Sequence, residues 1–290
     1  MTDTRLRESE RRYRATGTAD DGAAWLLERV RAGELPMRRL QILAALGHEP
    51  ALHALGSGAR APQEWVEEVC AERTVAVRAA MIACLEMQRV IDAPLPRPPL
   101  FPVSHAGPAV LELGDLLCTS ASAALRGRPE QLDRASKAAT EIARRLERRR
   151  DGICGYGEVP GPNTQERRPA LAVRGAIRAL AYKGDAPALR SAKESISIVL
   201  EVVGERASSE WTQCRLGDQD DVPDDSTEAI GVWRRKHQAL SEQVASAAVE
   251  RHVRAVSAVL RPWVASDRGP DPLKFLVQAD RSSPSQPSAS

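Results

Sequence analysis

Apolar residues recur with a helical period along most of the chain. Over residues 23–56 they return every three or four positions, and glycines interrupt the stripe before prolines restart it. Gly33 and Gly47 stand where a left-handed residue ends a helix, and Pro36 and Pro50 suit a first helical turn. This stretch therefore predicts three short helices joined by tight turns.

The same alternation of stop glycines and start prolines continues beyond residue 56, and alternating apolar runs of strand type are scarce. We therefore predict an all-α protein of about nine or ten helices, arranged as helical hairpins stacked in an irregular α-solenoid or bundle. The further helix starts are expected at Pro62, Thr74, Pro108, Pro129, Pro169 and Gly184–Pro187.

The last helix is predicted to be the longest. Asp225 suits an N-cap, Glu228 follows three residues later, and an apolar stripe then runs for more than thirty residues. The stripe consists of Ile230, Trp233, Leu240, Val244, Ala248, Ala255, Val259 and Trp263. Across the whole chain, the side chains expected to be buried include Leu26, Leu27, Leu43, Ile82, Leu85 and Val244.

Changes in composition divide the chain into five parts. Residues 1–19 are Arg-rich and predict a flexible arm or a frayed first helix, and residues 266–290 predict a loose tail in which 273–277 could dock. Between them lie an N-terminal helical layer (20–91), a Pro-rich connector (92–107) and a C-terminal helical layer (108–265). The connector could also serve as an SH3-type ligand, but a strap between two helical layers is the favoured interpretation.

The C-terminal layer shows signs of an internal duplication. Pro108 and Pro169 are 61 residues apart, and Gly127 and Gly184 are 57 residues apart. These offsets suggest that the hairpins 108–149 and 169–206 are copies, although shared Ala-rich composition would explain the match equally well.

Two segments carry a resemblance to a known group of proteins. The run W-L-x-x-R-V-R-x-G-x-L, followed by L-A-A-x-x-G-H-x-P-A-x-x-A-L-G, lies within residues 23–56. Together with R-P-W-V at Arg261–Val264 and D-P-L at Asp271–Leu273, it resembles uncharacterised bacterial helical-repeat proteins. The resemblance implies an all-helical fold and brings no reaction or site residue with it.

Composition narrows the possible partners. Aromatic residues make up only 3% of the 290 residues, so the core must be built from small aliphatic side chains. The net charge of +2 gives no global field for nucleic acid or an acidic membrane. The N-terminus lacks an apolar signal segment, and the five cysteines form no C-x-x-C pair. A cytoplasmic protein with reduced thiols and without a membrane association is expected.

The densest basic cluster is the strongest candidate for a binding site. Its members lie at the end of a predicted helix and just after the following loop: Arg144, Arg145, Arg148, Arg149 and Arg150, then Arg167 and Arg168. Such a cluster could bind phosphates. Cations also complement a helix C-terminus, however, and no aromatic residue is interleaved for base stacking, so a solvated helix end is the favoured interpretation.

No metal, cofactor or catalytic site is predicted. His237 and His252 are fifteen residues apart, roughly 22 Å along a helix, and cannot share an ion. His48 and His53 lack ligand spacing; the first is expected in a turn and the second at the surface. The acidic residues of the predicted loop 208–225 lack the EF-hand pattern, and the glycines of loop 151–167 match no phosphate-binding motif.

The sequence favours a non-enzymatic helical interaction or adaptor protein that binds a protein partner. The alternative is a nucleic-acid- or nucleotide-binding accessory protein that uses the basic helix end at Arg144–Arg150. An enzyme that uses Cys154 or the acidic loop is the third hypothesis.

Overall fold

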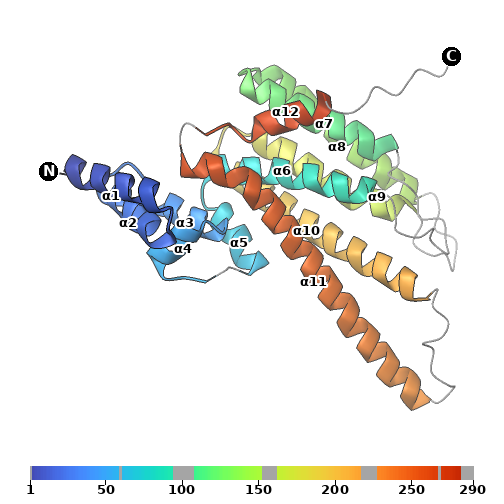
Figure 1. Ribbon diagram of the computed structural model, residues 1–290. Coiled ribbons are helices and arrows are strands. Elements are labelled where there is room, and N and C mark those ends of the chain that lie inside the picture. The colour runs from blue at the N-terminus through green and yellow to red at the C-terminus, as the bar shows by residue number, and fades with distance from the viewer. Residues whose placement is uncertain are drawn as a thin grey trace.

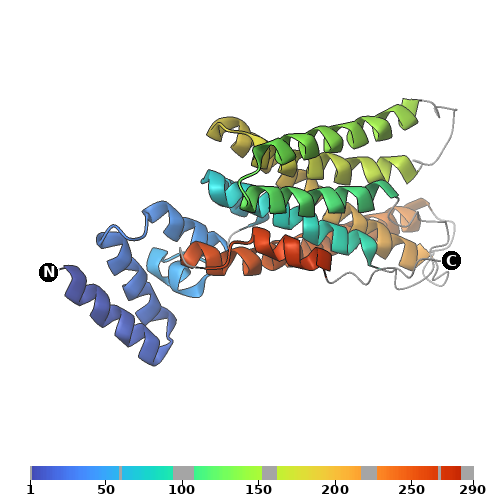
Figure 2. The same ribbon diagram turned by 90° about the horizontal axis from the view of Figure 1, so that it is seen from above.

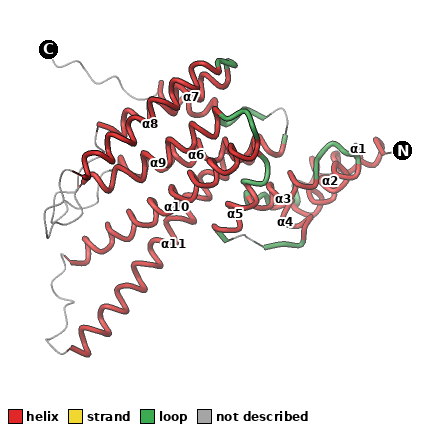
Figure 3. Tube along the Cα trace, turned by 180° about the vertical axis from the view of Figure 1, so that it is seen from behind, coloured by secondary structure: helices red, strands yellow, loops and turns green. Residues whose placement is uncertain are grey.

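The computed structural model describes residues 2–58, 61–93, 108–151, 162–216, 227–266 and 269–281. In these ranges the chain forms twelve α-helices and no strand, which confirms the predicted all-α fold (Figures 1 and 3). The helices are α1 (Thr2–Thr16), α2 (Ala19–Arg31), α3 (Met37–Ala45), α4 (Glu49–Leu55), α5 (Pro62–Val69), α6 (Arg73–Asp92), α7 (Pro108–Leu125), α8 (Pro129–Asp151), α9 (Pro162–Ala181), α10 (Asp185–Leu216), α11 (Thr227–Ala265) and α12 (Leu273–Arg281).

The five N-terminal helices form a small unit at one end of the molecule (Figure 2). Residues 1–19 were predicted as a flexible arm or a frayed first helix, and Thr2–Thr16 forms helix α1, which packs against α2. Leu6 is buried, and the Tyr13 ring stacks on Trp25 with 5.5 Å between the ring centroids. These apolar contacts hold a helix that its Arg-rich sequence alone would not stabilise.

The glycines predicted to end helices adopt the left-handed conformation that this role requires. Their φ angles are 75° at Gly33, 71° at Gly47, 60° at Gly56 and 62° at Gly127. A side chain at such a backbone angle is strained, so glycine is favoured at each turn. The helix start expected at Thr74 lies slightly earlier, because α6 begins at Arg73 with Glu72 as its N-cap.

Helix α6 lies at the centre of the larger unit and corrects the predicted division into layers. It packs against α9, α10 and α11, and also against α7 and α12. The side chains from Ala79 to Cys84 are all buried, so the helix is apolar around its circumference. A helix of this kind must be covered on every side. It therefore belongs with the C-terminal helices, and the N-terminal unit ends with α5.

Several predicted boundaries also shift in the C-terminal helices. Pro169 was expected to open a helix but lies inside α9, where Pro162 occupies the first position instead. Helix α10 was expected to end near Arg206 but continues to Leu216. Pro169 and Pro108 are therefore not equivalent, and the proposed duplication loses one of its two offsets. Helices α9 and α10 thus occupy part of the predicted loops 151–167 and 208–225. Residues 152–161 and 217–226 lie outside the described part.

The C-terminal layer was predicted to lie between a Pro-rich connector and a loose tail. The predicted connector falls mostly on residues 94–107, which lie outside the described part. The tail was predicted to be loose from residue 266 with a segment at 273–277 that could dock, and helix α12 begins at Leu273 and packs against α7 and α6. Leu273 and Leu276 are buried in that contact, which explains why this segment is helical.

The predicted long helix near the C-terminus is confirmed as α11, which has 39 residues, although the shorter α12 follows it and the buried face of α11 differs from the predicted stripe. The buried line is Ala248, His252, Val256, Leu260 and Val264, while Ala255 and Leu240 are exposed. Elsewhere, Leu26, Leu43, Ile82 and Leu85 are buried as predicted, whereas Leu27 and Val244 are only half-buried. The sequence offers α11 more than one apolar face, and packing against α6 selects the one that contains His252.

The N-terminal unit is attached to the end of α11 by hydrogen bonds to main-chain and side-chain groups. Arg261 donates to the Leu46 carbonyl, and Arg29 donates to the Ala265 carbonyl at 3.0 Å. The buried indole of Trp65 donates from Nε1 to Ser257 Oγ, also at 3.0 Å. The two segments that resemble helical-repeat proteins therefore meet at this attachment.

Candidate functional site

Three of the described arginines of the predicted basic site form ion pairs with glutamates of three different helices. On α8, Arg145 reaches across to Glu112 of α7 at 3.5 Å, and Arg144 lies 4.0 Å from Glu141 of its own helix. On α9, Arg168 pairs with Glu201 and Glu205 of α10. The guanidinium groups of Arg145 and Arg168 therefore turn toward different helices.

Carboxylates further reduce the capacity of these arginines to bind phosphate. Each of Arg144, Arg145 and Arg168 lies against at least one glutamate, so a phosphate would have to compete with an existing ion pair. Arg167 is half-buried, and the side chains of Arg148, Arg149 and Arg150 lie outside the described part. The arrangement fits a solvated helix end better than a phosphate clamp.

Helices α10 and α11 form an antiparallel hairpin whose outer half projects beyond the bundle (Figures 1 and 3). Of residues 230–247 in α11, all within the described part, none is buried. From Ala248 onward the helix is buried along one face. Among the described residues, α10 is the one helix that lies along the outer half of α11, and no side chain of residues 230–247 is fully covered (Figure 1).

The contacts inside the projecting half are specific. Ser208 and Ser241 share a hydrogen bond between their hydroxyl groups. One turn further out, the His237 ring lies between Trp233, at a centroid distance of 4.0 Å, and Trp211, at 5.7 Å. His237 Nδ1 also donates to the Trp233 carbonyl at 3.0 Å. These contacts fix the register of the hairpin and explain why α10 extends to Leu216.

The open side of this hairpin combines apolar and cationic side chains. Val232 is 53% exposed and Leu240 is 38% exposed, two of the four large apolar side chains that are exposed in the described part. Arg234, Arg235 and Lys236 lie between them in sequence and are exposed as well. We call residues 232–240 of α11 the hairpin patch.

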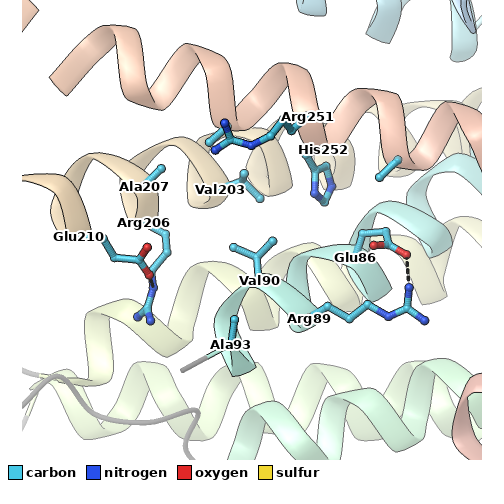
Figure 4. Close-up of a pocket in the computed structure, with 12 residues that line it drawn as sticks. Glu86, Arg89, Val90, Ala93, Val203, Arg206, Ala207, Glu210, Arg251 and His252 are labelled. Carbon is cyan, nitrogen blue, oxygen red and sulfur yellow. Dashed lines mark hydrogen bonds and ion pairs between the residues drawn. The ribbon is translucent and has the colours of Figure 1, made fainter. Parts of the chain in front are cut away.

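At the base of the hairpin, α6, α10 and α11 enclose a groove of about 370 Å³ (Figure 4). This volume is in the range of small-molecule sites. Its lining residues are Glu86, Arg89, Val90 and Ala93 of α6, Val203, Arg206, Ala207 and Glu210 of α10, and Ala248, Arg251, His252 and Ala255 of α11.

His252 is the most constrained polar group of this groove. Its side chain is only 5% exposed, and Figure 4 shows the ring pointing from α11 toward α6. The ring hydrogen-bonds to the backbone of Ala83, and its Nε2 atom has no hydrogen-bond partner among the described residues. Burial lowers the pKa of His252 to about 4, so the ring is neutral at pH 7.

The tautomer of His252 follows from these contacts. Because a neutral imidazole has one N–H, and Nδ1 is the nitrogen left to donate to Ala83, Nε2 carries a lone pair and accepts hydrogen bonds. A buried acceptor without a donor costs about 1–3 kcal/mol. The groove therefore contains an acceptor that a bound group could satisfy.

The charges around the groove are unevenly paired. Arg89 forms an ion pair with Glu86 at 2.6 Å, and Arg206 pairs with Glu210. Arg251 has no ion-pair or hydrogen-bond partner in the part of the chain that the structure describes. Three guanidinium groups and two carboxylates leave the groove with one positive charge in excess.

The sequence pointed to only part of this site. In the sequence His252 was considered together with His237 as a possible metal ligand, and the half-buried His237 lies apart from it in the projecting half. Arg89, Arg206 and Arg251 belong to three helices and share no motif that could have grouped them. The only available signal was a histidine in the apolar face of a long helix.

The remaining histidines and two of the cysteines have environments that indicate a structural role. His48 is the N-cap residue of α4, and burial and the nearby Arg261 both lower its pKa. His53 is exposed and hydrogen-bonds to Asp20 at 2.9 Å. Burial raises the pKa of the Cys70 and Cys84 thiols to about 12 each, so neither is an activated nucleophile. Cys154 and the acidic residues 218–225 lie outside the described part.

The described residues contain no group of three or more His, Cys, Asp or Glu side chains placed to hold a metal ion. None of the helices within the described ranges is both long enough and apolar enough to cross a membrane. Comparison of the chain with known protein families, curated proteins and solved structures gives no match. Its resemblance to helical-repeat proteins therefore stays a prediction.

Proposed function

We propose that this chain is a non-enzymatic interaction protein that binds a protein partner through the hairpin patch. The observation that carries the proposal is the division of α11 into two halves, one buried in the bundle and one along which, among the described residues, only α10 lies. A helical hairpin that leaves the core and presents apolar side chains to solvent suits helix-mediated recognition.

The composition of the patch defines the chemistry of the partner. Val232 and Leu240 would occupy apolar depressions of the partner, and Arg234, Arg235 and Lys236 would face carboxylates around them. Interfaces of this type place apolar anchors at the centre and charged residues at the rim. The expected partner surface is therefore apolar at its centre with an acidic rim.

Affinity capture with a matched control tests this proposal. The parent chain, the Val232→Glu/Leu240→Glu variant and the Met37→Glu/Leu125→Glu variant would each be used to capture proteins from a bacterial lysate for identification by mass spectrometry. Met37 and Leu125 are 47% and 38% exposed and lie far from the patch in sequence, so they control for added charge. A partner captured by the parent and control, and lost with the patch variant, supports the proposal.

The captured protein would then be purified and titrated calorimetrically. Loss of two apolar anchors should weaken its binding at least tenfold, since such anchors contribute 1 kcal/mol or more each. Equal affinity for the parent and the patch variant would exclude the hairpin patch as the binding surface.

The nucleic-acid alternative has less support, because Arg144, Arg145 and Arg168 of the predicted basic site lie against glutamates. A cytoplasmic location is part of our proposal. It is consistent with free thiols at Cys70, Cys84 and Cys118 and with the absence of a membrane-spanning helix among the described residues.

A further inference from the structure

The groove at the base of the hairpin has a polar interior group that the fold leaves unsatisfied. His252 lies 95% buried, being 5% exposed, yet its Nε2 lone pair meets no donor from the described residues. Buried polar atoms in folded proteins nearly always have partners. His252 is one of the residues that line a groove of about 370 Å³, so a ligand in this groove could supply a donor from outside the chain.

We propose that the groove binds a small amphipathic monoanion whose hydroxyl or N–H group donates to His252 Nε2 and whose carboxylate pairs with Arg251. This site is independent of the hairpin patch. It lies where α10 and α11 meet α6, whereas the patch lies in the projecting half of the hairpin.

Each part of the ligand follows from a part of the groove. Val90, Val203 and Ala248 provide an apolar lining that suits a hydrocarbon or aromatic body. His252 can accept but not donate at Nε2, which requires a donor on the ligand. Arg251 is a cation without a partner in the described part, which favours a carboxylate at the other end.

The alternative charge types fit less well. A dianion would exceed the single excess positive charge, and a cation would meet three arginine side chains around the groove. Glu86 and Glu210 are each engaged by an arginine, so neither is free to receive a cationic ligand. Hydroxylated or N–H-bearing monocarboxylic acids are therefore the ligand class.

The test uses three probe compounds that differ in one group at a time. They are 3-(4-hydroxyphenyl)propionate, 3-phenylpropionate, which lacks the donor, and 2-(4-hydroxyphenyl)ethanol, which lacks the anion. Each would be titrated into the full chain by calorimetry. The first should bind about tenfold more tightly than either of the others, because the second compound cannot form the buried hydrogen bond and the third cannot form the charge-assisted pair.

A nitrogen NMR experiment on the parent chain makes the test independent of any variant. The ¹⁵N signal of His252 Nε2 should lie at the position of a bare imine nitrogen in the free protein. It should shift toward that of a hydrogen-bonded nitrogen with the hydroxylated probe and stay in place with 3-phenylpropionate. An Nε2 signal that is already hydrogen-bonded in the free protein would mean that a bound water donates to this nitrogen without the ligand, and the proposal would be wrong.

Matched variants complete the test. His252→Phe and Arg251→Gln should each weaken the hydroxylated probe about tenfold, while His237→Phe and Arg254→Gln, on the same helix but outside the groove, should leave its affinity unchanged. Far-ultraviolet circular dichroism would verify that each variant is folded. Equal binding by all four variants, or no binding of any probe to the parent at millimolar concentration, would overturn the proposal.

Discussion

The guanidinium of Arg261 donates two hydrogen bonds to the carbonyl oxygen of Leu46, from Nε at 3.2 Å and from Nη2 at 3.0 Å. Leu46 is the C-cap residue of α3, so its carbonyl is one of the groups that a helix leaves without an internal partner. A cation at this position also complements the helix dipole. Two residues that are 215 positions apart thus fasten the N-terminal unit to α11.

Replacing Arg261 with Met should destabilise the chain by about 1–3 kcal/mol, because the Leu46 carbonyl loses its donor while the side chain keeps its length. Chemical denaturation followed by circular dichroism measures the change. Arg254→Met, an exposed position on the same helix, should change stability by less than about 0.5 kcal/mol. Equal effects of the two substitutions would show that the Arg261 contact contributes no stability.

Leu43→Ala should destabilise the chain by about 2–5 kcal/mol, because Leu43 is 0% exposed and its truncation leaves a cavity among the N-terminal helices. Met37→Ala on the same helix is the control, since Met37 is 47% exposed and should change stability by less than about 0.5 kcal/mol. A loss below about 0.5 kcal/mol for Leu43→Ala would contradict its place in the core. Urea denaturation of both variants provides the measurement.

The stability of the parent chain should fall as the pH is lowered from about 6.5 toward 4. The folded-state pKa of His252 is about 4, below its ordinary value of 6.5, so the unfolded chain binds more protons within this window. The contribution is fully present above pH 6.5 and amounts to roughly 3 kcal/mol from the difference in pKa. His48, whose pKa is also lowered, adds to the loss.

Urea denaturation of the parent and of His252→Phe at several pH values checks this prediction. The variant lacks the titrating ring, so its stability should decline less steeply over the same range. Parallel curves for the two proteins would show that His252 is not held neutral by burial.

Arg144→Gln/Arg145→Gln should leave stability within about 1 kcal/mol of the parent, because exposed ion pairs contribute about 0–1 kcal/mol. Fluorescence anisotropy with labelled DNA and RNA should show negligible binding by either protein at physiological salt. Two results together would instead favour the nucleic-acid alternative. The parent would bind with micromolar affinity, and the slope of log affinity plotted against log salt concentration would become shallower by about two in the variant.

Local features of the fold could be predicted because they depend on neighbouring residues. Gly33 and Gly47 end helices through a backbone angle that glycine adopts without strain, and this requirement is visible in the sequence. The length of α11 was predictable for the same reason, since its apolar residues recur along one continuous segment. The predicted end of α10 near Arg206 was wrong because a tertiary contact of the Trp211 ring lies beyond it and the helix continues to Leu216.

The partners of each helix could not be predicted, because pairing depends on which faces meet in space. Helix α6 packs among α9, α10 and α11, although the Pro-rich stretch that follows it in the sequence predicted a division at that point. The groove also results from the packing of helices that are distant in the sequence. The sequence shows that His252 lies on an apolar face, but its unpartnered Nε2 results from the side chains that three separate helices place around it.

The central position of α6 has a consequence for the order in which the chain is synthesised. Helix α6 ends at Asp92, whereas its coverings α10 and α11 begin at Asp185 and Thr227. At a translation rate of about 5–20 residues per second, the apolar surface of α6 stays without these two helices for roughly 5–20 s before synthesis of α10 begins. During that interval the nascent chain exposes apolar residues of its future core, and surface of this kind is prone to aggregation.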